Sequence, residues 1–338
     1  MKKIVSLLLA VLMLLSVISL VGCGEAKKSS EPVKFGLGLY SSMSKAVSAD
    51  GDTQGIGEAA VTAAAVILDK DGKILDCAID TADNTVNFTS DGKAVKAGEF
   101  KTKYELGDAY GMKAYGGAKK EWFEQIDAFI ALIKGKTYDE IKALVGKENK
   151  GNDDVINAGC TITISEYVLA IEKAVKNAKE SKAVADNSVK LGVISTQIET
   201  KDATADAKGK NGLDITVSAV AKGADGKITA MASDAVSVEF IFDTKGATDT
   251  DTSAELKSKR EKGDNYGMSA YGQDLNGDGT VKEWYAQADA FDTACIGKNS
   301  DEISKLALDT GYGVDDIQKA GCTINISDMV KAAVKASK

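Results

Sequence analysis

The 338-residue sequence contains no histidine. This absence excludes Ser-His-Asp and Cys-His catalytic groups, the usual zinc sites and the Cys-x-x-Cys-His attachment site of haem. No serine or cysteine has a general base in its sequence context, so we expect no hydrolase. Basic clusters are lacking too: the chain has 42 basic and 50 acidic residues, a net charge of −8. This balance argues against a nucleic-acid partner and against an electrostatic membrane contact.

Two stretches of the chain, 104–166 and 263–327, contain the same motifs in the same order. Each has a Tyr-Gly-Met-x-Ala-Tyr-Gly segment, then Lys-Glu-Trp, then Ala-Gly-Cys-Thr-Ile-x-Ile-Ser. Trp122 and Trp284 are 162 positions apart, as are Thr161 and Thr323. A period this long indicates a duplicated domain and not a solenoid. The function is therefore one that two copies of a domain can carry.

The N-terminus is typical of an exported protein. Lys2 and Lys3 precede an apolar run from Ile4 to Val21, and Gly22-Cys23 follows. A basic start, an apolar core and small residues at the cut indicate a secretory signal peptide. The cysteine makes the segment resemble a bacterial lipoprotein signal, which implies that Cys23 carries lipid (palmitate) on the extracytoplasmic face of the cell membrane. An uncleaved membrane anchor is the alternative, because the run is nearly long enough to span a bilayer.

The expected organisation is a signal peptide (1–22), a tether (23–32), a first repeat (33–180) and a second repeat (189–338). Removing the signal peptide leaves room for two domains of about 150 residues each. The boundary is expected near 177–188, where a Lys/Ala-rich helical stretch gives way to a strand-like segment.

Each repeat begins with strand signals and ends with helix signals, which predicts an α+β fold, an antiparallel sheet followed by helices. The expected strands are 33–40, 59–69, 74–81 and 85–88 in repeat one, and 189–194, 213–221, 228–233 and 236–242 in repeat two. Asp71-Gly72 and Asp225-Gly226 are expected to make tight turns.

The expected helices follow the strands. The helix at 119–133 and its copy should each bury one face, with short helices starting at Thr137 and Ser300, and closing helices at 165–179 and 327–336. The predicted buried faces are Trp122, Ile126, Phe129 and Ile133 in repeat one, and Trp284, Ala288, Phe291 and Cys295 in repeat two.

Five cysteines are present, and no two have Cys-x-x-Cys spacing. Cys160 and Cys322 are equivalent positions of the repeats, whereas Cys77 and Cys295 are not equivalent to each other. Free, buried, small apolar cysteines are the favoured interpretation. Disulfides between Cys77 and Cys160, and between Cys295 and Cys322, stay open because the protein is exported.

The Ala-Gly-Cys-Thr tetrapeptides, 158–161 and 320–323, stand just before the closing helices. The surrounding sequences are Asp-Asp-Val-Ile-Asn-Ala-Gly-Cys-Thr in repeat one and Asp-Asp-Ile-Gln-Lys-Ala-Gly-Cys-Thr in repeat two. They resemble the motif of the FMN-binding domain family, which is Asp-x-x-Ser/Thr-Gly-Ala-Thr. The Asp-Gly hairpin and the final helix fit that family's order of elements. The resemblance covers both repeats and implies one FMN on each of Thr161 and Thr323, joined through a phosphoester by a separate flavin transferase.

This sequence departs from the family motif in the same way twice. Alanine replaces serine, cysteine replaces alanine, and the aspartate stands one residue further from the threonine. The loop still suits a phosphate, because its glycine admits close backbone approach and N–H groups near a helix start favour anions. We therefore select a cofactor-binding set, with a loop in which Thr161 or Ser165 only caps a helix as the alternative. The set is Gly159, Cys160, Thr161, Gly321, Cys322 and Thr323.

The Tyr-Gly-Met segments are a second candidate. Tyr110 and Met112, with Tyr266 and Met268 in the second repeat, form loops that could lie against a flat ring such as isoalloxazine. The alternative is that these side chains only cover the tryptophan helix.

Repeat two has an insertion that reads Asp-Leu-Asn-Gly-Asp-Gly. Asp274, Asn276 and Asp278 match the front half of a calcium loop, and they resemble dockerin and EF-hand loops. The twelfth position is Tyr285 and not an acid, so a plain turn is the alternative.

Two functions follow. The first is a non-enzymatic lipoprotein that carries electrons through one flavin per repeat, with a membrane electron donor and a flavin transferase as partners. Two flavins in one tethered chain suit a short-range relay. The second is a surface lipoprotein on the same scaffold that binds a small ligand or a protein without flavin.

Overall fold

The computed structural model describes residues 33–271, 274 and 279–338. The predicted signal peptide and tether, with Cys23, lie outside the described residues. Within the described part of the chain, no helix is long and apolar enough to cross a membrane.

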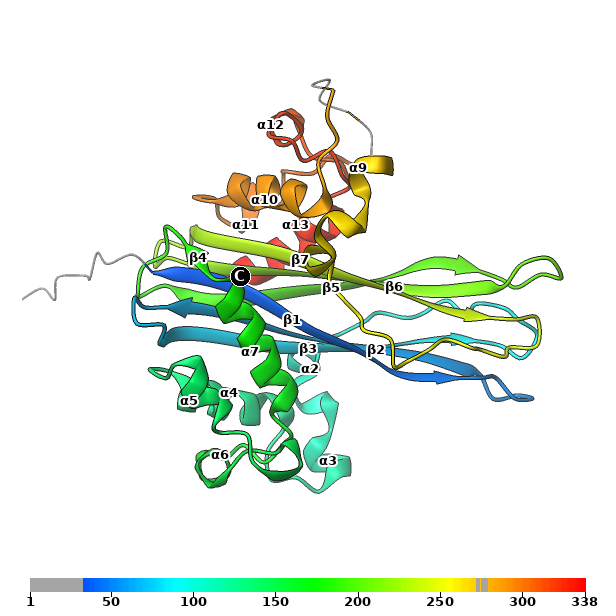
Figure 1. Ribbon diagram of the computed structural model, residues 1–338, viewed down its shortest axis with the longest axis horizontal. Helices are drawn as coiled ribbons and strands as arrows, with labels where there is room; N and C mark the ends of the chain where they lie inside the picture. The colour runs from blue at the N-terminus through cyan, green and yellow to red at the C-terminus, as the bar shows by residue number, and fades with distance from the viewer. Residues whose placement is uncertain (1–32, 272–273, 275–278) are drawn as a thin grey trace, which may run out of the picture. The chain divides into compact units, whose positions relative to one another are not determined.

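The elements of the two repeats follow one another in the same order (Figure 1). Repeat one comprises β1 (Lys34–Val47), β2 (Gly55–Leu68), β3 (Ile74–Phe88), α2 (Lys103–Leu106), η2 (Gly107–Tyr110), α3 (Met112–Gly116), α4 (Trp122–Ile133), α5 (Tyr138–Lys142), η3 (Lys147–Asn149), α6 (Asp153–Ala158), α7 (Ser165–Asn177) and β4 (Lys179–Glu180). Repeat two comprises β5 (Ser188–Lys201), β6 (Gly209–Lys222), β7 (Ile228–Phe242), α8 (Lys259–Lys262), η4 (Gly263–Tyr266), α9 (Met268–Tyr271), α10 (Trp284–Cys295), α11 (Ser300–Ile303), α12 (Asp315–Lys319) and α13 (Ser327–Ser337).

The predicted fold class, α+β, is confirmed. One sheet has the order β3-β2-β1-β4 and the other the order β5-β6-β7. All neighbouring strands are antiparallel, and β4 returns after the helices of repeat one to pair with the start of β1. The three long strands of each sheet therefore precede the helices that cover them.

The strands are longer than the sequence predicted, and two predicted breaks are wrong. Residues 74–81 and 85–88 form the single strand β3, and 228–233 and 236–242 form the single strand β7. Asp83 and Asn84 look like turn residues, but Asn84 is buried and donates a hydrogen bond of 2.6 Å to Ser195 Oγ on β5. A contact with the other sheet thus overrides the local turn signal.

The two sheets share one apolar core. Along β2, Ala63, Ala65 and Ile67 face the core that also contains β5, β6 and β7. The alternate residues Ala64 and Val66 face the helices of repeat one. The helices of repeat two cover the outer face of the second sheet. The result is four layers, with a helical layer on each outer side of the paired sheets (Figure 1).

The predicted helix faces are confirmed, because all eight residues named for α4 and α10 are buried. Thr137 caps α5 in a capping box with Glu140, as predicted. α11 begins at Ser300, as predicted, and its N-cap is Asn299, whose side chain accepts from the Glu302 N–H group.

Glycines on the first strand of each sheet let the closing helices lie close to the sheet. A Cβ atom on Gly38 would collide with the backbone of α7 at Ala174 and Ala170, and one on Gly192 would collide with α13 at Ala332. The closing helices also reach the other repeat. Lys173 of α7 pairs with Glu261, and Lys335 of α13 pairs with Glu105.

Gly38→Ala should therefore destabilise the protein. The added methyl group has no free space and must push α7 away from β1, at an expected cost of about 1–3 kcal/mol in the free energy of unfolding. Urea unfolding followed by far-UV circular dichroism measures the change. Gly98→Ala is the matched control, because a Cβ there meets no atom within 4 Å. Equal effects of the two substitutions would contradict the close approach of helix and strand.

Candidate functional site

The two Ala-Gly-Cys-Thr loops connect short helices to the closing helices. Gly159 follows α6 with φ of +100°, and Gly321 follows α12 with φ of +94°, a region that strongly favours glycine. The next residues, Cys160 and Cys322, are fully buried. Thr161 is exposed and Thr323 is partly buried. Each loop thus fixes its cysteine in the core and brings its threonine to the surface.

A buried glutamine from the tryptophan helix holds each threonine. Gln125 Oε1 accepts the backbone N–H of Thr161 at 2.8 Å and its Oγ1 hydroxyl at 3.0 Å. Gln287 Oε1 does the same for Thr323, at 2.8 and 3.1 Å. Both glutamines are 1% exposed. One carbonyl therefore orients the hydroxyl in each repeat.

The same glutamines connect the loop to the Tyr-Gly-Met segment. Gln125 Nε2 donates to the Lys120 carbonyl at 3.1 Å and to Met112 Sδ at 3.9 Å. Gln287 Nε2 donates to the Lys282 carbonyl at 2.7 Å and to Met268 Sδ at 3.5 Å. The structure thus brings together the two segments that the sequence offered as separate candidates. The glutamines were missed, although Lys-Glu-Trp-x-x-Gln stands in both repeats.

A buried glutamate shapes each Tyr-Gly-Met segment. The Glu121 carboxylate accepts the N–H groups of Met112 (2.8 Å) and Lys113 (3.1 Å), and Glu283 makes the equivalent bonds in repeat two. Tyr110 and Met112 are half-buried against the helical core of repeat one, and Tyr266 and Met268 against that of repeat two. Their contact with a flat ring remains a prediction.

Three N–H groups of the loop are used within the protein, and the helix-capping alternative is wrong. The N–H groups of its Gly-Cys-Thr part bond within the protein: Gly159 donates to Ile156, Cys160 to Val155 and Thr161 to Gln125. They are not donors for a ligand. The helix-capping alternative also fails, because the N-cap of α7 is Ile164, which makes no side-chain cap hydrogen bond. The same holds at α13.

A lysine side chain lies over the glycine of each loop. A Cβ atom on Gly159 would collide with Lys120 Nζ, and one on Gly321 with Lys282 Nζ. Among the described residues, no carboxylate forms an ion pair with either lysine, and Lys282 Nζ makes only a long hydrogen bond of 3.5 Å to the Ala320 carbonyl. Each loop therefore has a cation against its glycine, two residues before its threonine.

The cysteines of the described chain are free and buried, as favoured from the sequence. Burial raises the pKa of the Cys160 thiol to about 11 and that of Cys322 to about 12. Burial also raises the pKa values of Cys77 and Cys295. These thiols stay protonated at neutral pH, so they are poor nucleophiles and poor metal ligands.

The calcium prediction falls partly outside the described residues, which include Asp274 but not Asn276 or Asp278. Asp274 is exposed, and its Oδ2 accepts the Gly279 N–H at 2.9 Å. Within the described part of the chain, no three histidine, cysteine or acidic residues group as metal ligands.

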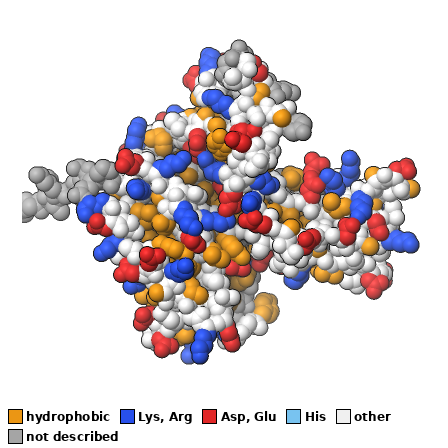
Figure 2. Space-filling model, in the orientation of Figure 1, with side chains coloured by type: hydrophobic (Ala, Val, Ile, Leu, Met, Phe, Trp, Pro, Cys, Tyr) orange, Lys and Arg blue, Asp and Glu red, His pale blue; other side chains and the backbone are white. Residues whose placement is uncertain are grey.

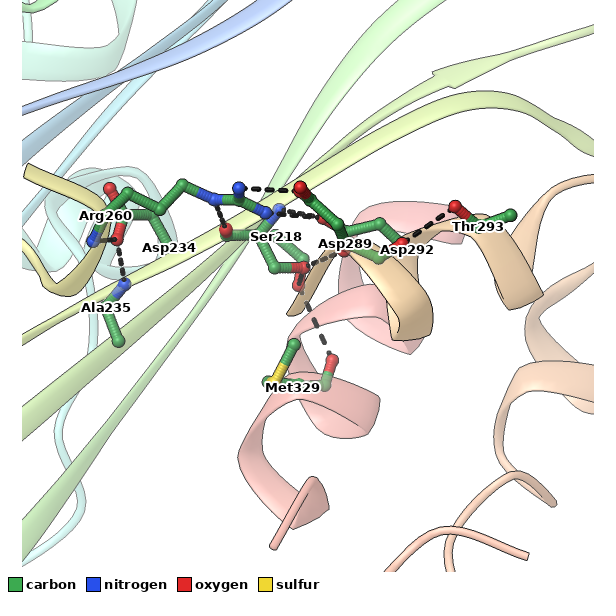
Figure 3. A network of polar contacts seen from close by, with 9 residues as sticks. Ser218, Asp234, Ala235, Arg260, Asp289, Asp292, Thr293 and Met329 are labelled. Carbon is green, nitrogen blue, oxygen red and sulfur yellow. Dashed lines mark hydrogen bonds and ion pairs between the residues drawn. The ribbon is translucent and has the colours of Figure 1, made fainter. Parts of the chain in front are cut away.

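Repeat two contains a partly buried charged network that the sequence did not indicate (Figure 3). The Arg260 guanidinium donates to Asp289 (2.7 Å) and Asp292 (3.0 Å), and its Nε donates to the Ser233 carbonyl (2.5 Å). Asp292 also accepts the N–H and hydroxyl of Ser233. These side chains cover the free edge of β7 at Ser233. In repeat one, Tyr104 stands at the position of Arg260 and Ile130 at that of Asp292.

This network borders a cavity of about 900 Å³ that both repeats line. Lys176 and Lys179 come from the end of repeat one, and Tyr285, Asp289 and Arg260 come from repeat two. Lysine, arginine and acidic side chains are interspersed on the face drawn in Figure 2, without a large patch of one sign.

Comparisons with known proteins identify no family. No family model matches the chain, and no solved structure matches it. A chlorophenol reductase of Desulfitobacterium hafniense is 49% identical over 43 residues, which are 13% of this chain and 13% of that protein. The chain thus aligns with about an eighth of its relative.

Asp234, beside Arg260, should make stability depend on pH. It is 5% exposed, and burial raises its pKa to about 6, against the opposing hydrogen bonds from Ser258 and Arg260. An unfolded aspartate has a pKa near 3.9. The folded protein thus binds the proton more tightly, and the free energy of unfolding should fall as the pH rises from about 4 to 6.

Asp234→Asn should reduce the fall in the free energy of unfolding between pH 4 and 6 by an amount on the order of 1–3 kcal/mol. The reason is that the amide keeps an acceptor oxygen but does not ionise. Urea unfolding of both proteins between pH 4 and 7 measures the difference. Asp225→Asn, in an exposed turn, is the control and should leave the wild-type dependence unchanged. A variant at position 234 with that same dependence would contradict the argument.

Proposed function

We propose that this protein is a membrane-anchored extracytoplasmic lipoprotein with two FMN-binding-like repeats, which carries electrons through flavin. The observation that supports the proposal best is the duplicated setting of Thr161 and Thr323. Each hydroxyl is near the surface, oriented by one buried glutamine, and each loop has a lysine over its glycine. This is a suitable place for a phosphate-bearing cofactor.

The chemistry of attachment fits the contacts of the threonine. Esterification removes the hydroxyl proton, so Thr161 Oγ1 can no longer donate to Gln125. The backbone N–H of Thr161 keeps its bond of 2.8 Å to the same oxygen. The loop would thus keep its anchor after modification. The flavin supplies the redox chemistry when bound, and the protein holds its phosphate end.

A second function is favoured by the cavity between the repeats. A binding protein without flavin would use that volume of about 900 Å³, a size in the range of small-molecule sites. The calcium loop around Asp274 stays a separate proposal for a structural metal in repeat two.

Intact-mass analysis after co-expression with a flavin transferase tests the attachment. We expect up to two FMN adducts on the mature chain. Thr161→Ala should remove one adduct and Thr323→Ala the other, because each hydroxyl is the attachment point of its loop. Thr163→Ala is the control, an exposed threonine two residues further on, and should leave both adducts. Adducts retained in the double variant would place the flavin elsewhere.

Membrane attachment is tested separately at the predicted lipidation site. Cys23→Ser should abolish the lipid and leave the protein in the soluble fraction or as an uncleaved precursor, because no other anchor is proposed. Cell fractionation and the mass of the mature protein measure this. A variant that still fractionates with membranes at the mass expected for an acylated chain would reject the anchor.

A further inference from the structure

The lysines over the two glycines occupy equivalent positions in the two repeats. Many other lysines of the described residues pair with a carboxylate, such as Lys113 with Glu124 at 3.3 Å and Lys210 with Glu239 at 2.8 Å. Lys120 and Lys282 do not. Two equivalent cations without an ion-pair partner, each lying against the glycine of its loop, are suited to an anion.

The lysine and the threonine are held by the same group. Gln125 Nε2 bonds the carbonyl of Lys120, while its Oε1 bonds the N–H and hydroxyl of Thr161. The residue after Lys120 is Glu121, the N-cap of α4. The lysine therefore starts from a fixed backbone position, and a ligand at the threonine meets a cation already in place. Gln287 builds the same arrangement around Lys282.

The glycine gives the lysine room to lie against the loop. With no Cβ at Gly159 or Gly321, the Nζ atom reaches the backbone of the loop. The N–H groups of the Gly-Cys-Thr part are used within the protein, so they cannot balance the charge of a phosphate. The lysine of each loop therefore balances the charge of the phosphate.

We infer that Lys120 and Lys282 are the phosphate-binding residues of the two loops, and that each site takes a phosphate monoester such as the terminal group of FMN. Each site also includes the glycine and the threonine hydroxyl of its loop. The inference rests on the proposed function for the identity of the ligand, but not for the anion site itself. It predicts that the phosphate, and not the flavin ring, decides whether a ligand binds.

Binding is measured on the full mature chain made without a transferase, by titration of FMN and riboflavin with flavin fluorescence. FMN should bind at least tenfold more tightly than riboflavin, and inorganic phosphate should compete. The double variant Lys120→Ala/Lys282→Ala should weaken FMN binding at least tenfold, whereas lysine-to-arginine changes should largely preserve it. Lys119→Ala, an exposed neighbour, is the matched control and should have no effect.

Any of three results would overturn the inference. They are equal affinity for FMN and riboflavin, unchanged FMN binding in the double alanine variant, and no binding of FMN or phosphate by the wild type. The proposed covalent attachment is tested independently of the anion site. Lysine-dependent FMN binding with no mass adduct would keep the anion site and reject attachment. Adducts that form equally well in the double lysine variant would keep attachment and reject the role of the lysines.

Discussion

The fold depends on two central strands that are buried on both faces. Residues of β2 alternate between the core shared with the other sheet and the core under the helices of their own repeat, and β6 does the same. Small side chains such as Ala63, Ala64 and Ala65 allow close packing on both sides. Neither sheet can leave the other without exposing an apolar face, so the duplicated repeats act as one folding unit.

Much of this fold follows from the sequence, since local signals agree with it. The period of 3.6 residues predicted the buried face from Trp122 to Ile133, and the Thr-x-x-Glu spacing predicted the cap at Thr137. The errors arose where distant contacts decide. Asn84 reads as a turn residue until Ser195 on the other sheet provides its partner. Asp234, in the middle of β7, bonds the backbone of Arg260.

The site was predictable only in part for the same reason. A glycine with φ of +100° and a buried cysteine could be expected from the motif. Gln125 carries no recognisable chemistry in the sequence, because its role is to satisfy groups from two distant loops at once. Lys120 looked like one of many surface lysines. Its position over Gly159 becomes visible only when the loop after α6 is folded back onto the start of α4.

The repeats have diverged where they meet. In repeat two, Arg260 stands at the position equivalent to Tyr104, and Asp292 at the position equivalent to Ile130. Asp292 is buried whereas Asp289 stays exposed, and removing the Asp292 carboxylate from water is costly unless it is paired. The guanidinium and two carboxylates border the cavity between the repeats, which is consistent with a role in ligand binding there. Duplication thus left two similar loops on the outside and one new polar site at the junction.

The four layers also constrain any electron transfer. The two loops lie on opposite outer layers, after α6 on one side and after α12 on the other (Figure 1). Two sheets packed about 10 Å apart and a helical layer of about 10 Å on each side separate them by roughly 30 Å. A relay between two flavins, which the tandem sequence predicted, would have to cross this distance. Flavins at Thr161 and Thr323 would each be open to partners on their own side of the molecule.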